Sequence, residues 1–119
     1  MALTIEQILT QLSTAAPDMQ VVVKDWLNML VYNDIDVWAY TNETVMFGYA
    51  SVSEYVTVKD VKNILKYNPA AFGDFPTNNP TDILYFSRTG DPTHLKMEFV
   101  SVEIINGIVV LNACSIDYL

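Results

Sequence analysis

Residues 96–117, KMEFVSVEIINGIVVLNACSID, decide the fold class of this chain. Two apolar, β-rich runs flank Asn106-Gly107, and this dipeptide is the strongest short-range signal for a two-residue hairpin turn. The stretch therefore predicts a C-terminal β-hairpin, and a turn at this position fixes its register. The expected cross-strand pairs include Ile105/Ile108, Val102/Leu111 and Phe99/Cys114.

Both runs change the face on which their apolar side chains lie. Val102 and Leu111 mark the apolar face near the turn, whereas Phe99 and Cys114 lie on the opposite face farther away. Because both strands change at the same place, we expect the hairpin to be strongly twisted or bent around a core. Residues 82–87 are expected to form the neighbouring strand.

Helical patterns occupy the beginning and the middle of the chain. Thr4 and Gln7 make a capping-box pair, and apolar residues at positions 5, 8, 9 and 12 give one stripe of a helix. Thr57 and Asp60 cap another helix, which ends before residues 68–69 and carries three lysines on its outer side.

Residues 19–31 allow two interpretations. Three consecutive valines at 21–23 favour a strand, because β-branched side chains lose rotamer freedom in a helix. The length of the segment favours a helix, and we predict a helix. Residues 35–40 and 44–50 read as two extended stretches, or as a helix end followed by a strand.

These patterns predict one α+β domain over residues 1–119. In this domain, N-terminal helices and one mid-chain helix pack on a curved antiparallel sheet that ends in the C-terminal hairpin.

Composition narrows the class of partner. The chain has 119 residues, of which 51% are apolar and 17% charged, so we expect an exposed apolar patch that contacts a protein partner or a second copy in a homodimer. Six Lys and Arg against 14 Asp and Glu give a net charge of −8, and this excludes direct binding to nucleic acid. An acidic surface steers a basic protein partner, or serves only to keep the chain soluble.

Cellular location is predicted from what the sequence contains. Residues 1–10 hold no basic stretch typical of a secretory signal, and no apolar run approaches the ~20 residues that a membrane span needs. The single cysteine, Cys114, cannot form an internal disulfide. We therefore expect a cytoplasmic protein that does not bind membranes.

The sequence offers no motif for catalysis, a metal or a cofactor, so none is expected. His94 is interpreted as a solvated turn residue, and Cys114 as a buried thiol without the electropositive neighbours that a nucleophile needs. Asp34 and Asp36 are spaced so that their carboxylates point apart. Four isolated glycines do not make a phosphate-binding loop.

The candidate binding site lies around residues 68–81, NPAAFGDFPTNNPT, which show no helical or strand period. Long loops in compact domains are often functional, and here the apolar rings are expected to cover the core or line a pocket. Arg88 and Tyr85 are expected to converge on this loop. The predicted site residues are Phe72, Phe75, Asn78, Asn79, Tyr85 and Arg88.

Two stretches resemble the nuclear-transport-factor-like cone fold, the polyketide-cyclase type. Residues 32–36 followed by 44–47 are similar to that family's Gly-Asp-x-Asp helix end and first strand, and residues 106–117 to its closing hairpin. The resemblance implies a cone-shaped sheet with an apolar pocket. The acid and base of the family's isomerases have no counterpart here. Residues 12–23 instead resemble the opening of small phage proteins of unassigned role.

Three functional hypotheses follow, the third of which is a bare structural homodimer. The favoured one is a non-enzymatic binding protein that acts through its acidic surface or the 68–81 loop, such as a small accessory or inhibitory factor of a phage or mobile element. The alternative is a cone-fold protein that binds a small molecule in an apolar pocket, with isomerase or hydrolase activity.

Overall fold

The computed structural model describes residues 2–26, 29–32, 34–40, 43–49, 56–67, 83–87 and 96–115. The described elements are α1 (Ile5–Leu12), β1 (Gln20–Asp25), β2 (Leu30–Tyr32), β3 (Asp34–Tyr40), β4 (Glu43–Tyr49), β5 (Val56–Thr57), α2 (Val58–Tyr67), β6 (Leu84–Ser87), β7 (Lys96–Ile105) and β8 (Ile108–Ser115). Helices and one sheet confirm the α+β class.

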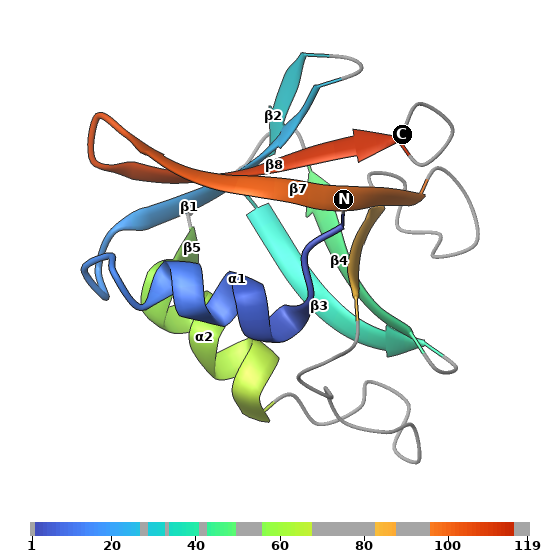
Figure 1. Cartoon of the computed structure of the whole chain (residues 1–119), viewed down its shortest axis with the longest axis horizontal. Helices are drawn as coiled ribbons and strands as arrows, with labels where there is room; N and C mark the ends of the chain where they lie inside the picture. The colour runs from blue at the N-terminus through green and yellow to red at the C-terminus, as the bar shows by residue number, and fades with distance from the viewer. Residues whose placement is uncertain are drawn as a thin grey trace.

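The sheet is curled and mixed. Its strands follow the order β2-β1-β8-β7-β6-β4-β3, and β5 also pairs with β1. β1 runs parallel to β8 and β4 runs parallel to β6, so the expectation of a purely antiparallel sheet was wrong. β1 also contacts β3, because the sheet curls until its ends approach each other. Figure 1 shows the two helices side by side on the inside of this curl.

α1 begins as predicted. The Thr4 hydroxyl accepts a hydrogen bond from the Gln7 backbone N–H at 3.2 Å, and the Gln7 side chain accepts one from the Thr4 N–H at 2.9 Å. Ile5, Ile8 and Leu12 are buried, which confirms the apolar stripe. The segment before α1 is fixed to the sheet, because the Leu3 N–H donates to the Phe99 carbonyl at 2.8 Å.

The predicted second helix was wrong, because residues 20–25 form strand β1. Val21, Val22 and Val23 are all buried, and a continuous run of buried β-branched residues is typical of a strand inside a sheet. The valines pair with β8 through Val21/Val109 and Val23/Leu111. These contacts are distant in sequence, so the length of the segment, on which the helix prediction depended, did not reveal them.

α2 lies where its capping residues predicted. The Asp60 carboxylate accepts from the Thr57 N–H at 3.0 Å, and the Thr57 hydroxyl accepts from the Asp60 N–H at 3.3 Å. The first N–H groups of any helix lack partners within the helix. Here the Val58 and Lys59 N–H groups donate to carbonyls in the loop after α1, each at 2.9 Å.

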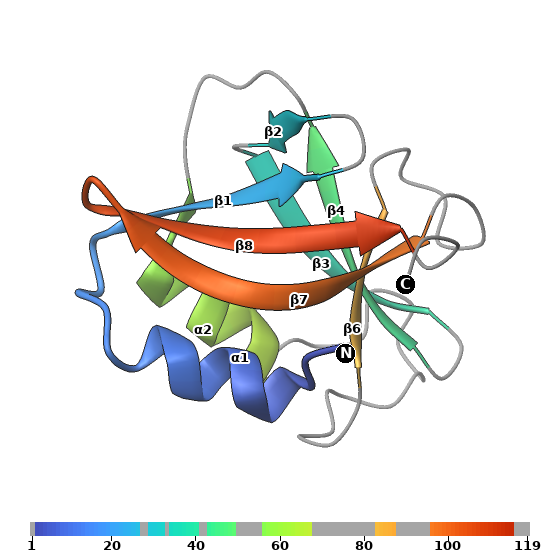
Figure 2. The same ribbon diagram turned by 45° about the horizontal axis from the view of Figure 1, so that its top comes forward.

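The C-terminal hairpin has the predicted register from its turn as far as Ser101/Asn112, and then shifts by one residue. A bulge between Phe99 and Ser101 pairs Phe99 with Ala113, so the expected pairing of Phe99 with Cys114 was wrong. The extra residue explains the change of apolar face in β7: Phe99 and Val102 both contact the core although an odd spacing separates them. Figure 2 shows the hairpin bowing over the helices.

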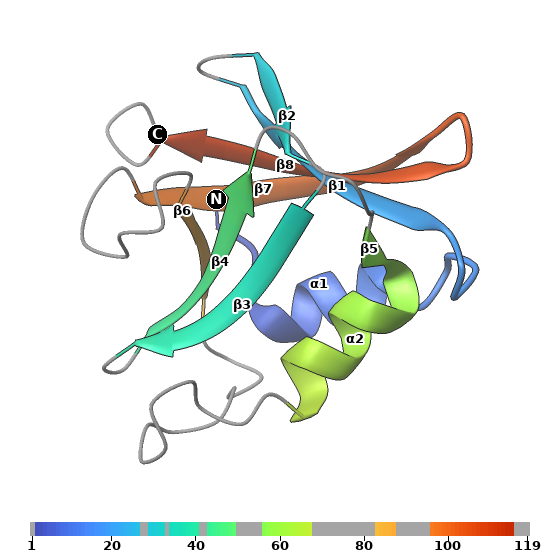
Figure 3. The same ribbon diagram turned by 180° about the vertical axis from the view of Figure 1, so that it is seen from behind.

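The structure also describes the predicted strands before the hairpin and in the middle of the chain. β6 pairs antiparallel with β7, which confirms the predicted neighbouring strand over residues 84–87. β3 and β4 pair antiparallel, so residues 35–40 and 44–50 contain two extended stretches, seen from behind in Figure 3.

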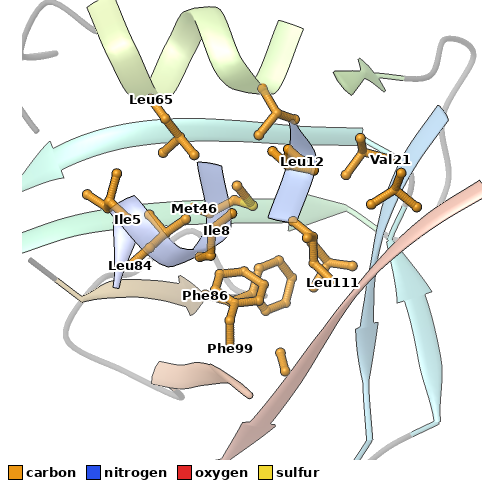
Figure 4. Packing of buried hydrophobic residues seen from close by; sticks show 14 of the residues in the cluster. Ile5, Ile8, Leu12, Val21, Met46, Leu65, Leu84, Phe86, Phe99 and Leu111 are labelled. Atoms are coloured by element: carbon orange, nitrogen blue, oxygen red, sulfur yellow. The ribbon is translucent and has the colours of Figure 1, made fainter. Parts of the chain in front are cut away.

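The core lies between the inner face of the sheet and the two helices. Phe86 and Phe99 are fully buried, and their ring centroids lie 6.1 Å apart in an edge-to-face arrangement. Figure 4 shows these rings next to Ile8 and Leu111, with Leu65 of α2 above them. The core therefore joins both helices to strands from both ends of the chain.

The hairpin turn gives a test of the register. Gly107 has a φ of +77°, and a Cβ atom there would contact nothing within 4 Å. We expect Gly107→Ala to lower the free energy of unfolding by about 1 kcal/mol, because an L side chain disfavours this backbone region. Gly107→Asn should cost less, because Asn tolerates the left-handed region. Equal losses in urea denaturation would contradict this backbone explanation.

Candidate functional site: the outer face around Trp26

The face of the sheet that points away from the helices carries two rows of polar and aromatic side chains. Val21 and Val23 contact the core, so alternation places Lys24 and Trp26 on the outer face. Strand register extends each position across the sheet. One row runs Lys24, Asn112, Ser101, and the next runs Cys114, Glu98, Tyr85. Trp26 follows β1 directly and adjoins the second row, because its backbone N–H donates to the carbonyl of Ala113. We call these seven residues, together with Lys96 beside Tyr85, the outer-face cluster.

Trp26 is exposed but held in a fixed orientation. Its indole N–H donates to Asn112 Oδ1 at 2.7 Å, and Asn112 Nδ2 donates to the Ser101 hydroxyl at 2.9 Å. Asn112 is only 2% exposed, whereas Trp26 is 46% exposed. The Trp26 backbone N–H also donates to the Ala113 carbonyl at 3.1 Å. The ring is therefore anchored through its polar edge while much of its apolar surface remains in water.

Each aromatic ring of the outer-face cluster has a lysine ammonium above it. Lys24 Nζ lies 3.9 Å from the centroid of the Trp26 ring, and Lys96 Nζ lies 4.5 Å from that of Tyr85. Both distances fall within the range of cation–π interactions, which contribute about 0.5–1 kcal/mol at exposed sites. The two pairs orient the rings further. Three strand spacings separate Trp26 from Tyr85, or about 14 Å between backbones.

Charged side chains of both signs surround the two rings. Among the side chains that the structure describes on β1, β6, β7 and β8, Lys24 and Lys96 contribute two positive charges, and alternation places Glu98 and Glu103 on the same face with two negative charges. These four charges offset one another. A contact made here would depend on ring surface and hydrogen bonds more than on long-range attraction.

An apolar edge adjoins the cluster at the tip of the β1–β2 hairpin. Leu30 and Val31 are 42% and 44% exposed, and Met29 at the turn is more exposed still. Val31 pairs with Lys24 and so lies on the outer face, whereas Leu30 pairs with Asp25 on the inner side. Both faces of β2 are thus open to solvent at these positions. Figure 2 shows β2 at the top of the view, with β1, β8 and β7 between it and the helices.

Surface depressions lie elsewhere on the described residues. One of about 390 Å³ is lined by the hairpin turn and the loop before β1, and one of about 400 Å³ by Pro17, Lys59, Lys62 and Asn63. Both are open to solvent and hold no buried ionisable side chain. Their geometry gives no arrangement of an acid, a base or a nucleophile.

The structure describes one of the predicted site residues. Tyr85 is half-buried on the outer face of β6, opposite Glu98. Phe72, Phe75, Asn78, Asn79 and Arg88 lie outside the described residues, so their convergence with Tyr85 stays a prediction. Cys114 pairs with Glu98 and is half-buried, which corrects its predicted burial opposite Phe99.

Sequence reasoning missed Trp26, Asn112 and Ser101 as a unit. The helix predicted for residues 19–31 gave Trp26 no place on the sheet, and Asn112 was not among the predicted site residues. The available signal was the run of three valines before Lys24, which favours a strand. Because side chains alternate along a strand, Val23 and Trp26 then point to opposite faces of the sheet.

The described residues were compared with the requirements of a metal site and of a membrane-spanning helix. Within the described ranges, no three His, Cys, Asp or Glu side chains gather as metal ligands would. Neither described helix has the length and apolar character needed to cross a lipid bilayer.

The anchoring of Trp26 can be measured with a double-mutant cycle. We expect Asn112→Ala to lower the free energy of unfolding by about 1–3 kcal/mol, because the indole N–H and the Ser101 hydroxyl lose their shared partner. Trp26→Phe removes the indole N–H and retains an aromatic ring. The double variant should show a coupling energy of at least about 0.5 kcal/mol by urea denaturation. Strictly additive losses would show that the 2.7 Å hydrogen bond does not contribute.

Comparisons of the chain with models of protein families, with curated proteins and with solved structures found no match. Functional reasoning about this protein therefore starts from its own geometry.

Proposed function

We propose that this chain is a non-enzymatic binding protein that acts through protein–protein interaction, with the outer-face cluster as its contact surface. The observation that carries the proposal is the half-exposed Trp26 ring, whose indole N–H is fixed by a nearly fully buried Asn112. Ordering a tryptophan at the surface by a buried amide is unnecessary for the core, which lies on the other side of the sheet.

The chemistry of Trp26 suits the centre of an interface. Tryptophan and tyrosine are enriched among the residues that contribute most binding energy, because they bury a large rigid surface. A side chain that is already ordered loses little conformational entropy on binding. Asn112 and Lys24 hold the Trp26 ring before any partner arrives. The second ring, Tyr85, extends the same surface three strands away.

The charges described around Trp26 and Tyr85 refine the kind of partner. Since Lys24 and Lys96 offset Glu98 and Glu103 there, the partner need not be strongly basic at this contact. The acidic remainder of the chain then serves solubility and repels acidic proteins from the wrong faces. We propose that the protein is a small accessory or inhibitory factor of a phage or mobile element, since such a factor would use a surface of this kind.

The alternative hypothesis of a small-molecule binder receives less support. A cone-fold pocket would lie on the concave side of the sheet. In the described residues, that side is packed with Phe86, Phe99 and the apolar stripe of α1. The side chains that combine exposure with a fixed orientation lie on the opposite face.

Affinity capture tests the proposal. We expect the immobilised chain to capture a protein from a lysate of its source organism, and Trp26→Ala to weaken that capture about thirtyfold, as a hot-spot loss of 2 kcal/mol implies. Capture should persist at high salt, because the proposed contact depends on the surface of the Trp26 ring, and salt does not screen apolar contacts as it screens charges.

Ile105→Ala is the matched control. Ile105 is 47% exposed, similar to Trp26, but lies at the turn end of β7, where it pairs with Ile108, about 20 Å along the hairpin from the level of Trp26. Capture that survives Trp26→Ala, or that Ile105→Ala reduces equally, would show that the outer-face cluster is not the contact surface.

A further inference from the structure

Strand β2 is an apolar sheet edge exposed on both of its faces. Among the described strands it pairs only with β1, and it ends the strand order of the sheet. Leu30 and Val31 point to opposite faces and are both more than two-fifths exposed. Edge strands present backbone N–H and C=O groups that can pair with another chain, and proteins usually protect them with charges, proline or a bulge. The β2 sequence, Leu-Val-Tyr, has none of these.

We infer that β2 pairs antiparallel with β2 of a second copy, forming a symmetric dimer with one continuous sheet. Antiparallel pairing of identical edge strands about a two-fold axis is self-complementary, because the same surface serves both copies. This inference goes beyond the proposed function and does not depend on it.

The local charge pattern favours a second copy over a charged partner. Residues 19–32 contain two charged side chains, Lys24 and Asp25, and Asp25 is fully buried. This stretch is therefore where two copies of a chain with a net charge of −8 can meet without bringing carboxylates together. A basic protein would be attracted to the acidic surfaces elsewhere and would meet Lys24 here.

Symmetry keeps the two lysines apart. In a pairing centred on Val31, the rows across the dimer read Lys24, Val31, Val31 and Lys24, since Lys24 pairs with Val31 within each copy. Three strand spacings then separate the two Lys24 backbones by about 14 Å. This exceeds the Debye length of about 8 Å at physiological ionic strength, so their repulsion is largely screened.

The size of the patch determines how strong the dimer is. Stable interfaces bury about 800 Å² on each partner, and one short strand with Trp26, Met29, Leu30 and Val31 offers less. We therefore expect a weak dimer that dissociates on dilution. A two-fold axis that relates antiparallel strands is perpendicular to the sheet, so it places both Trp26 rings on the same face. The dimer would thus present two outer-face clusters to one partner.

Sedimentation over a concentration series tests the inference. The wild-type chain should be monomeric at a concentration on the order of 1 µM and approach twice the monomer mass near 1 mM, as expected for an interface at the small end of the size range. Val31→Lys should raise the dissociation constant at least tenfold, because it places a charge at the centre of the paired edge. Ile105→Lys, an equally exposed change at the other hairpin tip, should leave the constant unchanged.

A second measurement does not depend on any variant. Amide chemical shifts of residues 29–32 should change with concentration, while those of residues 103–108 should not. A wild-type chain that is monomeric at 1 mM would overturn the inference, as would dimerisation that Val31→Lys leaves intact. If a monomeric chain captures another protein, the proposed function is supported and the dimer inference is wrong. If the chain forms the dimer but captures no other protein, the dimer inference is supported and the proposed function is wrong.

Discussion

Parallel pairing between β1 and β8 joins residues 20–25 to residues 108–113, and the rest of the architecture depends on this contact. It places Val21 and Val23 in the core beside Val109 and Leu111, with the first helix immediately before β1 in sequence. It also brings Trp26 next to Asn112, so the same pairing that completes the core creates the outer-face cluster. The entropy of closing so long a loop must be offset by this burial, which explains why all three valines are buried.

The bulge between Phe99 and Ser101 has a comparable role on the other side of β8. Without it, the alternation that buries Val102 would place Phe99 on the outer face. With it, Phe99 turns inward to contact Phe86, and Ser101 remains outside where its hydroxyl meets Asn112. One extra residue thus completes both the aromatic core and the hydrogen bonds that orient Trp26. Bulges are often found where a side chain has to be re-aimed, and this hairpin is such a case.

The side chains on the two faces of the sheet are held in place by different interactions. The inner face excludes water by packing apolar side chains from α1, α2 and five or more strands around the two phenylalanines. The outer face is ordered by polar contacts, with an amide, a hydroxyl and two lysines holding rings that remain in solvent. The edge strand β2 then leaves the outer face open to extension on one side. Such an arrangement is typical of a surface that meets another molecule by contact area rather than by chemistry in a pocket.

The sequence by itself determined the features that short-range physics controls. The α1 cap at Thr4, the α2 cap at Thr57 and the turn at Asn106-Gly107 each depend on residues within three positions of one another. The α+β class and the hairpin register near the turn followed from these signals. The expected site residues fell mostly outside the described part of the chain, and only Tyr85 joined the cluster that the structure shows.

Tertiary structure alone decided the identity of β1, the parallel pairs and the bulge. Residues 19–31 carry both a helical spacing and a run of β-branched valines, and local preferences of this kind differ by only a fraction of a kcal/mol per residue. The contact with β8 settles the choice because burying Val21 and Val23 against it stabilises the strand by far more. Trp26 changes from a helical core position to an exposed, anchored ring for the same reason. The surface that we propose for function is therefore a consequence of one long-range pairing.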